Sequence, residues 1–335
     1  WTWSESVQHE KGDSLLPSGS VSTLNGYVRM STNQSPCLSE VQEVWEQWSD
    51  DMKSQFKKEF GDIALLVKVP VDIHLMRAMV QFWNPTYNCF TFGKVDMTPT
   101  LEEYEVLINC PMIKNDSIYV KPNSTSGFKK KLMQITGKDK EFWDRKVTGH
   151  EDPSEEGQRV SWRVFKDLIA SCDEEPTKVR RLYALCIYGL VLFPRTPEHI
   201  DPSTVGLFEK LSKGINPVPA ILAETYRSLT ACKKASEGRF LGCAQLLEVW
   251  FRGHRWNSPY SALRFRTTYS PIEEHLKSCI VEKKTEAQWN ELFQNLSDSD
   301  IVWKACWLNR GSTYRYRCGD CDWIPLAGIW GGTAY

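Results

Sequence analysis

The sequence predicts a mainly α protein: a single large helical domain with a small β element near residues 88–96 and an irregular aromatic C-terminal tail. Apolar residues recur at the 3.6-residue period of a helix along most of the chain, whereas strand-like alternation is confined to a few short stretches. Of the 335 residues, 25% are charged and 41% are hydrophobic, which is ordinary for a globular protein and excludes a disordered or collagen-like chain. No repeat of fixed length is present, so a solenoid is not expected.

The chain divides into a leader and one domain. Residues 1–37 are rich in Ser, Gly and Asn and lack periodicity, so we expect a loosely ordered leader there, followed by the helical domain over residues 38–335. Ser39 and Gln42 form a capping-box pattern that predicts the start of the first helix. Apolar residues then recur at helical spacing as far as Gly61, where a glycine favours a helix end.

The next expected elements are a helix, a short β segment and another helix. The first helix follows Pro70 and ends at the Asn-Pro pair of residues 84–85, because the residue before a proline disfavours helical backbone. Residues 88–92 then place two Phe side chains on the same face, as a strand does. Thr100 and Glu103 form a further capping-box pattern, which predicts a helix start at this threonine.

Residues 112–160 are the least regular part of the interior. Apolar spacing predicts a short helix from Phe128, and residues 118–120 suit an edge strand. The stretch 150–158 has no apolar residue, so we expect a hinge or surface loop at residues 147–160. Further helices are predicted around residues 162–169, 178–193, 208–211, 221–229, 240–251 and 289–296.

The helix at residues 178–193 is expected at the centre of the core. Its uncharged apolar run, from Leu182 to Phe193, has 12 residues, whereas a transmembrane helix needs about 20. We therefore expect a buried helix and no contact with a membrane. The residues predicted to be nearly inaccessible are Leu182, Leu185, Cys186 and Leu190.

The cysteines indicate thiols rather than a disulfide framework. There are 11, an odd number, and most lie within apolar helical patterns, which is typical of reduced, buried thiols in the cytosol or nucleus. Cys318 and Cys321 have the spacing of a zinc-knuckle pair, but a pair supplies only two of the four ligands that a structural zinc needs. We expect a tight turn with buried thiols here and no metal site.

A site for a polyanion has to be a local patch, because the formal net charge is −1. The strongest candidate is a segment without acidic residues that runs from Arg252 to Arg266 and interleaves arginines with aromatic side chains. Arginines clamp phosphates and aromatics stack on bases, so the segment suits nucleic acid. The alternative is a helix exit whose arginines pair with distant acids and whose aromatics belong to the core. The candidate nucleic-acid-binding residues are Arg252, Arg255, Trp256, Tyr260, Arg264 and Arg266.

A second basic stretch runs from Phe128 to Lys146. It contains seven Lys or Arg residues against three acids, a net charge of +4. Charge runs of this kind are usually solvated faces, so it ranks below the arginine segment as a candidate.

Several motifs occur in an order that resembles the plant mobile domain. They are Phe-Trp-Asn-Pro at 82–85, Cys-Phe-Thr-Phe-Gly-Lys at 89–94, Met-Thr-Pro-Thr-Leu-Glu-Glu-Tyr at 97–104, an apolar helix ending in Phe-Pro at 188–194, and Gly-Cys-x-x-Leu-Leu-x-x-Trp at 242–250. The chain most resembles an uncharacterised plant branch of that family found near retrotransposon sequence. That branch also has the Tyr-Arg-Cys-Gly-Asp motif of residues 316–320.

The resemblance implies an association with transposable elements and, as in host-encoded members, a role in nuclear gene silencing and genome maintenance. Some members carry the label aminotransferase-like, which would require a Schiff-base lysine and a partner for the pyridine nitrogen of the cofactor. Neither is assignable in this sequence, so we expect no cofactor.

Enzyme signatures are also missing from the sequence, which lacks G-x-S-x-G, G-x-G-x-x-G, P-loop and H-E-x-x-H motifs. We therefore expect no catalytic residue, and interpret the chain as a non-enzymatic nuclear interaction module of transposable-element-related origin that binds protein partners or nucleic acid. The alternative is a divergent metal-dependent nuclease or transposition accessory enzyme, for which the Asp pairs at 298/300 and 320/322 are the available carboxylates. A cytoplasmic location is the alternative to the nucleus, and the partner's identity and the oligomeric state stay open.

Overall fold

The computed structural model describes most of the chain. The described residues are 28–30, 36–93, 95–109, 127–149, 157–172, 175–211, 214–235, 238–254, 270–278, 284–301, 325–327 and 332–334. Within them the fold is mainly α, as predicted, and β structure is limited to sheets of two or three short strands. The buried apolar residues form one hydrophobic core that extends from Val28 to Ile301.

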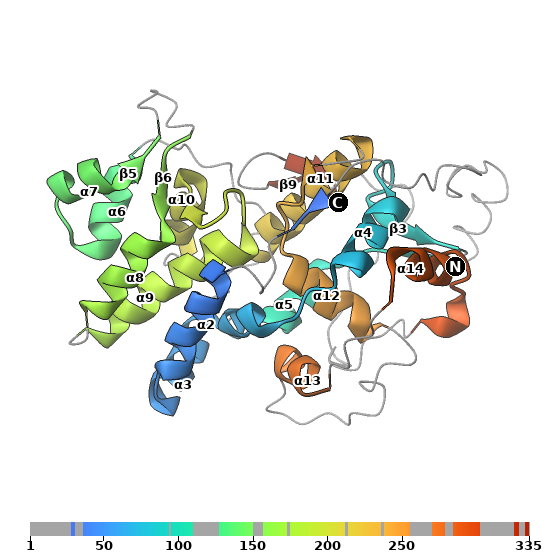
Figure 1. The fold of residues 1–335 in the computed structure, drawn as a ribbon, viewed down its shortest axis with the longest axis horizontal. Helices are drawn as coiled ribbons and strands as arrows, with labels where there is room; N and C mark the ends of the chain where they lie inside the picture. The colour runs from blue at the N-terminus through green and yellow to red at the C-terminus, as the bar shows by residue number, and fades with distance from the viewer. Residues whose placement is uncertain are drawn as a thin grey trace.

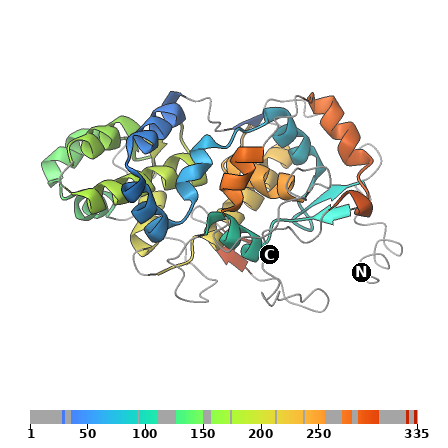
Figure 2. The same ribbon diagram turned by 90° about the horizontal axis from the view of Figure 1, so that it is seen from below.

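The helices are arranged along one long axis, as Figures 1 and 2 show. Those formed by residues 128–211 gather at one end, and those formed by residues 218–253 and 286–294 gather at the other. The helices of residues 36–60 lie beside the first group.

The first predicted helix is in fact two helices. α2 (Pro36–Gln47) already contains Ser39, so the predicted start at this residue was wrong. α3 (Asp50–Phe60) begins at Ser49, whose side chain caps its N-terminus. The apolar spacing continues across this break, which is why periodicity alone did not reveal it. α3 ends at Gly61, as predicted, and this glycine has a φ of 72° that other residues rarely adopt.

A 3₁₀ helix and an α-helix follow. The 3₁₀ helix η1 (Ile63–Lys68) was not predicted, because its six residues are too short to show a period. α4 (Ile73–Phe82) begins at Asp72, whose side chain accepts hydrogen bonds from two N–H groups of its first turn. Trp83, which was expected on this helix, lies in the strand that follows.

The small β element predicted near residues 88–96 is confirmed. β2 (Trp83–Asn84), β3 (Cys89–Phe92) and β4 (Val95–Met97) form an antiparallel sheet in that order. α5 (Leu101–Ile108) then begins at the predicted capping box, in which both reciprocal hydrogen bonds are present.

The next described part is a pair of helices and a second sheet. α6 (Phe128–Thr136) is the predicted short helix, whereas α7 (Lys140–Lys146) was not predicted. The sheet consists of β5 (Val147–Thr148), β6 (Arg159–Ser161) and β7 (His199–Ile200), with antiparallel pairing throughout. The described ends of the predicted loop at 147–160 are therefore paired strands, and the predicted edge strand at 118–120 lies outside the described residues.

The central helix is where the sequence places it. α9 (Pro176–Ile187) packs beside α8 (Trp162–Ala170) and continues directly into η2 (Tyr188–Leu192), a π-helix. The four residues predicted to be inaccessible are all buried, with exposed fractions of 0% for Leu182, Leu185 and Cys186 and 4% for Leu190. From Leu182 to Leu192 every residue is buried, so this part of the helix is held by packing on every face, whereas the first turns of α9 are partly exposed.

Gly189 allows η2 to lie close to the second sheet. A Cβ at this position would come within 2.7 Å of Cγ1 and 3.0 Å of Cγ2 of Ile200 in β7. Because interiors are packed to crystal-like density, a side chain here would displace its neighbour.

The remaining helices agree with the predicted series, with two additions, α13 and η4. They are α10 (Pro202–Leu211), α11 (Val218–Ala235), α12 (Ala244–Gly253), α13 (Pro271–Ser278), α14 (Glu286–Gln294) and the short 3₁₀ helix η4 (Asp298–Asp300). α13 was not predicted, because its eight residues are too few to show a helical period. None of the described helices combines the length and apolar character needed to cross a bilayer.

Part of the predicted leader belongs to the core. β1 (Val28–Arg29) pairs in parallel with β8 (Gly238–Arg239), and the N–H of Phe240 donates to the carbonyl of Arg29 at 2.9 Å. Val28 has no exposed surface. The composition of the leader hid this strand, because two residues are too few to show alternation.

The C-terminal tail contains a β hairpin among its described residues. β9 (Pro325–Ala327) pairs antiparallel with β10 (Gly332–Ala334), and both strands lie against α11. The tail, which was predicted to be irregular, therefore contains regular β structure among its described residues. Cys318 and Cys321 lie outside the described residues.

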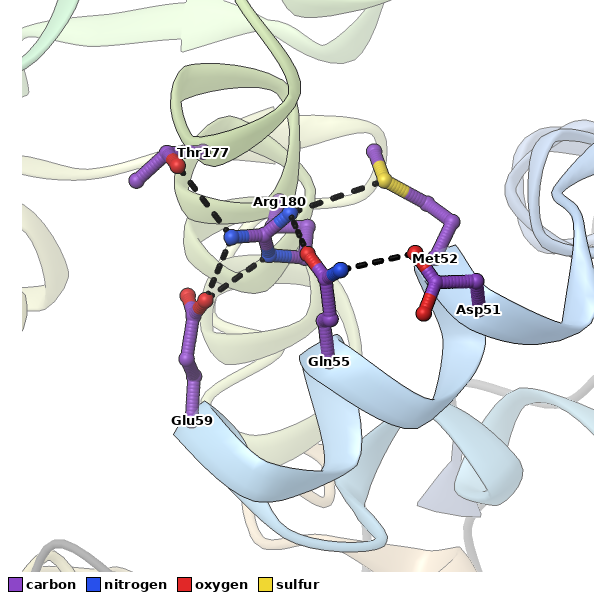
Figure 3. A network of polar contacts seen from close by, with 6 residues as sticks. All are labelled: Asp51, Met52, Gln55, Glu59, Thr177 and Arg180. Carbon is purple, nitrogen blue, oxygen red and sulfur yellow. Dashed lines mark hydrogen bonds and ion pairs between the residues drawn. The ribbon is translucent and has the colours of Figure 1, made fainter.

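A buried arginine joins α3 to α9 (Figure 3). The guanidinium of Arg180, 5% exposed, donates to Glu59 through Nε at 2.9 Å, to Gln55 at 2.8 Å and to Thr177 at 3.2 Å. Gln55 in turn donates to Asp51 at 2.7 Å. These contacts use most of the donors of Arg180, so this arginine is structural.

Candidate nucleic-acid interface

Arg252, the first residue of the predicted arginine segment, is buried inside the fold. Its side chain is 7% exposed, its Nε donates to Oε1 of Glu248 at 2.5 Å, and its guanidinium lies 3.7 Å from Oδ2 of Asp72. The guanidinium carbon also lies 5.8 Å from the ring centre of Trp289. Arg252 thus links α12 to α4 and α14, and for this residue the alternative of pairing with acids holds.

The two carboxylates around Arg252, those of Asp72 and Glu248, also make hydrogen bonds to other parts of the fold. Asp72 caps α4 and accepts a hydrogen bond from the indole of Trp289 at 3.1 Å, and its N–H donates to Glu248 at 3.1 Å. Burial raises the pKa of Glu248 to about 7, although Arg252 opposes this rise. The neighbouring His275 is 1% exposed. Burial, together with the smaller effect of the positive charge of Arg252, lowers the pKa of its imidazole to about 3.

His254, at the end of α12, is fixed in the same manner. Its Nε2 lies 2.9 Å from Oε1 of Glu103, and the indole of Trp250 donates to the other oxygen of this carboxylate at 2.8 Å. Burial alone would raise the pKa of Glu103, but the contacts with His254, the Thr100 N–H and Trp250 lower it. The carboxylate that closes the capping box of α5 therefore also anchors the C-terminal end of α12.

The chain is anchored again where it returns at Ser270. The Ser270 hydroxyl accepts a hydrogen bond from the N–H of Glu273 at 3.3 Å and interacts with the carboxylate of Asp62. Lys57 on α3 pairs with Glu273 and lies 3.7 Å from Asp62. Both ends of the interval 255–269 are consequently held by charged side chains of the folded body.

The other five predicted binding residues all fall within that interval and lie outside the described residues. They are Arg255, Trp256, Tyr260, Arg264 and Arg266. Their role in binding nucleic acid stays a prediction. Arg252 differs from them, because its guanidinium contacts carboxylates within the fold.

A groove that sequence reasoning missed lies beside the returning end of the segment. It has a volume of about 780 Å³, and Lys53, Lys57 and Lys58 of α3 line it together with Lys68 of η1 and Glu273 of α13. The signal for it was the Lys-x-x-x-Lys-Lys spacing of α3, which places these lysines on one side of the helix. The fourth lysine comes from the unpredicted η1, so the set could not be assembled from the sequence.

The lysines of the groove differ in how far their charge is neutralised. Lys57 pairs with two acids, as described, and Lys68 pairs with Glu46 at 2.5 Å. Lys53 donates to the main-chain carbonyl of Glu46 at 3.2 Å, a contact that leaves its charge uncompensated. Lys58 is exposed and has no ion pair among the described residues. Asp50 of α3 is exposed and also lines the groove. The groove therefore offers the positive charges of Lys53 and Lys58 to a negatively charged ligand, beside one acid that offsets part of them.

The acidic pairs considered for a nuclease are only partly described. Asp300 accepts hydrogen bonds from the Ser297 N–H at 2.9 Å and hydroxyl at 2.5 Å, so it caps η4. Residues 320 and 322 lie outside the described residues. Within the described part of the chain, no three His, Cys, Asp or Glu side chains gather as metal ligands would.

Comparison with known proteins gives a family and two distant relatives. A family model described as "Domain of unknown function (DUF7745)" matches residues 41–335. The chain is 25% identical over 220 residues to the protein MAINTENANCE OF MERISTEMS of Arabidopsis thaliana, covering 63% of this chain and 43% of the relative. It is 25% identical over 203 residues to MAIN-LIKE 2 of the same plant, covering 58% of this chain and 28% of the relative.

These two relatives support part of the resemblance to the plant mobile domain that the sequence motifs indicate. Both are plant mobile domain proteins, which supports the family likeness read from the sequence motifs. The chain spans less than half the length of either relative. No solved structure matches it.

Proposed function

The chain belongs to the DUF7745 family, and from that premise we propose that it is a non-enzymatic nuclear interaction module that binds nucleic acid. The observation that carries the proposal is the anchoring of the segment 255–269 at both ends beside the lysine-lined groove. The segment contributes three arginines and no acid, and the groove contributes Lys53 and Lys58. Positive side chains of this kind neutralise phosphates and release condensed counterions.

The residues from Arg252 to Arg266 have different roles in this proposal. Arg252 and His254 are committed to carboxylates of the folded body and anchor the end of α12 after which the segment begins. Arg255, Arg264 and Arg266 supply the phosphate contacts, while Trp256 and Tyr260 supply surfaces on which bases stack. Because stacking requires unpaired bases, the segment favours single-stranded nucleic acid.

A filter-binding titration of single-stranded DNA and RNA at two salt concentrations tests the proposal. The wild-type protein should bind at low salt and lose affinity as salt rises. The variant Arg255→Ala/Arg264→Ala should lower the slope of log affinity against log salt, and Trp256→Ala should lose about 1–3 kcal/mol per stacked base. Lys58→Ala should lower the slope as well.

The matched control is Lys234→Ala, which removes an exposed lysine of α11 that does not line the groove. It should leave the slope unchanged. If neither DNA nor RNA is retained at low salt, the nucleic-acid proposal is wrong and protein partners become the interpretation to pursue, by affinity purification from plant nuclei.

The nuclear location and the origin from transposable elements are further parts of the proposal. They are supported by the resemblance to the plant mobile domain, and imaging of a fluorescently tagged full chain in plant cells tests the first. A purely cytoplasmic signal would contradict it. Incubation of labelled DNA with the protein and Mg²⁺ or Mn²⁺ tests the alternative nuclease, and a cleaved product would overturn the non-enzymatic interpretation.

A further inference from the structure

The helices α6 and α7 carry a concentration of positive charge that is only partly paired within the described part of the fold. Residues 128–146 contain seven Lys or Arg side chains and three acids. Four of the basic side chains are exposed, and three of these, Lys130, Arg145 and Lys146, have no hydrogen bond or ion pair within the described residues. We name this surface, formed by residues 128–146, the α6–α7 surface.

The acids of the α6–α7 surface do little to offset these charges. Asp139 caps α7 by accepting a hydrogen bond from the Phe142 N–H at 2.8 Å. Asp144 accepts one from Lys129 at 2.7 Å, and this contact lowers the pKa of its exposed carboxyl. Glu141 is exposed and has no partner among the described residues, so the three acids together leave an excess of four positive charges on this surface for a ligand.

A structural role accounts for only part of the exposed cations: Arg145 and Lys146 lie in the last turn of α7, where the helix dipole favours positive charge, but Lys130 lies in the first turn of α6. The first turn of α6 holds three consecutive lysines, at 129–131, at the end of the helix where the backbone dipole is already positive. Lysines in this place disfavour the helix rather than stabilise it. Sequences that break a local rule in this way often do so where a ligand binds.

The α6–α7 surface is nevertheless held rigidly. Phe128, Leu132 and Trp143 have no exposed surface and pack into the core. The indole of Trp143, on α7, donates to the hydroxyl of Thr136, on α6, at 3.2 Å. α6 also contacts α9 and α10. The positive side chains therefore project from a fixed scaffold, so their spacing is preset before a ligand arrives.

We propose that the α6–α7 surface binds the phosphate backbone of double-stranded nucleic acid without regard to base sequence. A duplex presents regularly spaced phosphates, which suits lysines and arginines spread over two helices. The described surface exposes no large aromatic or aliphatic side chain here, so it offers nothing to stack on bases or to enter a lipid layer. The ligand class is therefore the duplex backbone.

The proposal rests on the proposed nucleic-acid function but places a second site elsewhere on the molecule. Figure 1 shows α6 and α7 at one end of the long axis, whereas α13 and the anchored ends of the arginine segment lie near its middle. Figure 2 shows the same separation from below. Two separate sites with different preferences, duplex for one and single strand for the other, suit a protein that holds both kinds of nucleic acid at once.

Fluorescence anisotropy of a labelled DNA duplex tests this inference. The variant Lys130→Gln/Arg145→Gln/Lys146→Gln removes three exposed charges and should bind the duplex at least tenfold more weakly at low salt. Its slope of log affinity against log salt should fall by about 2 to 3, because each lost phosphate contact changes the slope by about 0.9. Single-strand binding should stay as in the wild type. Lys234→Gln, an exposed lysine on α11, is the control and should change neither quantity.

The outcomes separate this inference from the proposed function. If Arg255→Ala/Arg264→Ala loses single-strand binding while the triple variant binds duplex normally, the proposed function holds and the α6–α7 surface is not a site. If the triple variant alone is impaired, the α6–α7 surface is confirmed and the arginine segment is not. Equal competition by poly-glutamate or by phosphatidylserine vesicles, at matched charge, would overturn the assignment to nucleic acid. An unchanged thermal midpoint shows that the triple variant is folded.

Discussion

The buried ion pair of Arg252 gives the sharpest prediction. Arg252→Met keeps an unbranched side chain of similar length but removes the guanidinium. Glu248, whose side chain is 1% exposed, then loses its 2.5 Å partner, and Asp72 loses a cation at 3.7 Å. Removing one partner of a buried pair costs about 3–5 kcal/mol, because a buried charge is left uncompensated. We expect a loss of that size in the free energy of unfolding at pH 8.

The same variant should recover stability in acid. Arg252 holds down the pKa of Glu248, which burial already raises to about 7, so its removal raises that pKa further above the ordinary value of 4.5. A folded state that keeps a proton the unfolded chain releases gains stability as pH falls. His275, whose pKa Arg252 lowers, shifts in the same sense. The difference between variant and wild type should therefore shrink from pH 8 to pH 5.

Urea unfolding followed by tryptophan fluorescence measures these quantities. The double variant Glu248→Leu/Arg252→Met should regain most of the loss, because replacing both members of a buried pair by apolar residues is often neutral. A single-variant loss below about 1 kcal/mol at pH 8, or a double variant as unstable as the single, would refute the reasoning.

Two predictions concern the central helix. Leu185→Ala should cost about 2–5 kcal/mol in urea unfolding, since Leu185 is fully buried and leaves a cavity; a loss below about 1 kcal/mol would show that the helix is peripheral. Gly189→Ala should cost about 1–3 kcal/mol, because its Cβ meets Ile200 at 2.7 Å. Gly189→Ala/Ile200→Ala should be more stable than the sum of the two single losses predicts, whereas strict additivity would contradict the contact.

Helix starts were predictable where the signal is local. The predicted capping box at Thr100 depends on a side chain and a backbone group three residues apart, and it is present in the structure. The spacing of Thr285 and Gln288 is the same kind of signal, and this capping box is also present, at the start of α14. The similar pattern at Ser39 failed because α2 begins earlier, at Pro36, and Ser39 is an interior residue. Pattern alone cannot tell a cap from a serine inside a helix, because the apolar spacing around both is the same.

The candidate site shows why distant partners escape the sequence. Glu248 lies one helical turn before Arg252, so that pair was open to prediction from spacing. Asp72 caps the N-terminus of α4, far away in the chain, and only its contacts with Glu248 of α12 and Trp289 of α14 bring it to the same guanidinium. The lysines of the groove likewise come from two separate elements, α3 and η1, which only the packing of the fold brings together. The basic stretch at 128–146, in contrast, is contiguous and could be read directly from the sequence.

The pairing of β1 with β8 constrains how the protein assembles during synthesis. Val28 is completed early, but the strand edge that receives it lies roughly 210 residues later. At about 5–20 residues per second, a ribosome needs on the order of 10 to 40 s to cover that interval. Throughout it, β1 has no strand to pair with. β1 therefore docks only after β8 has been synthesised, although its own residues are made about 210 residues earlier.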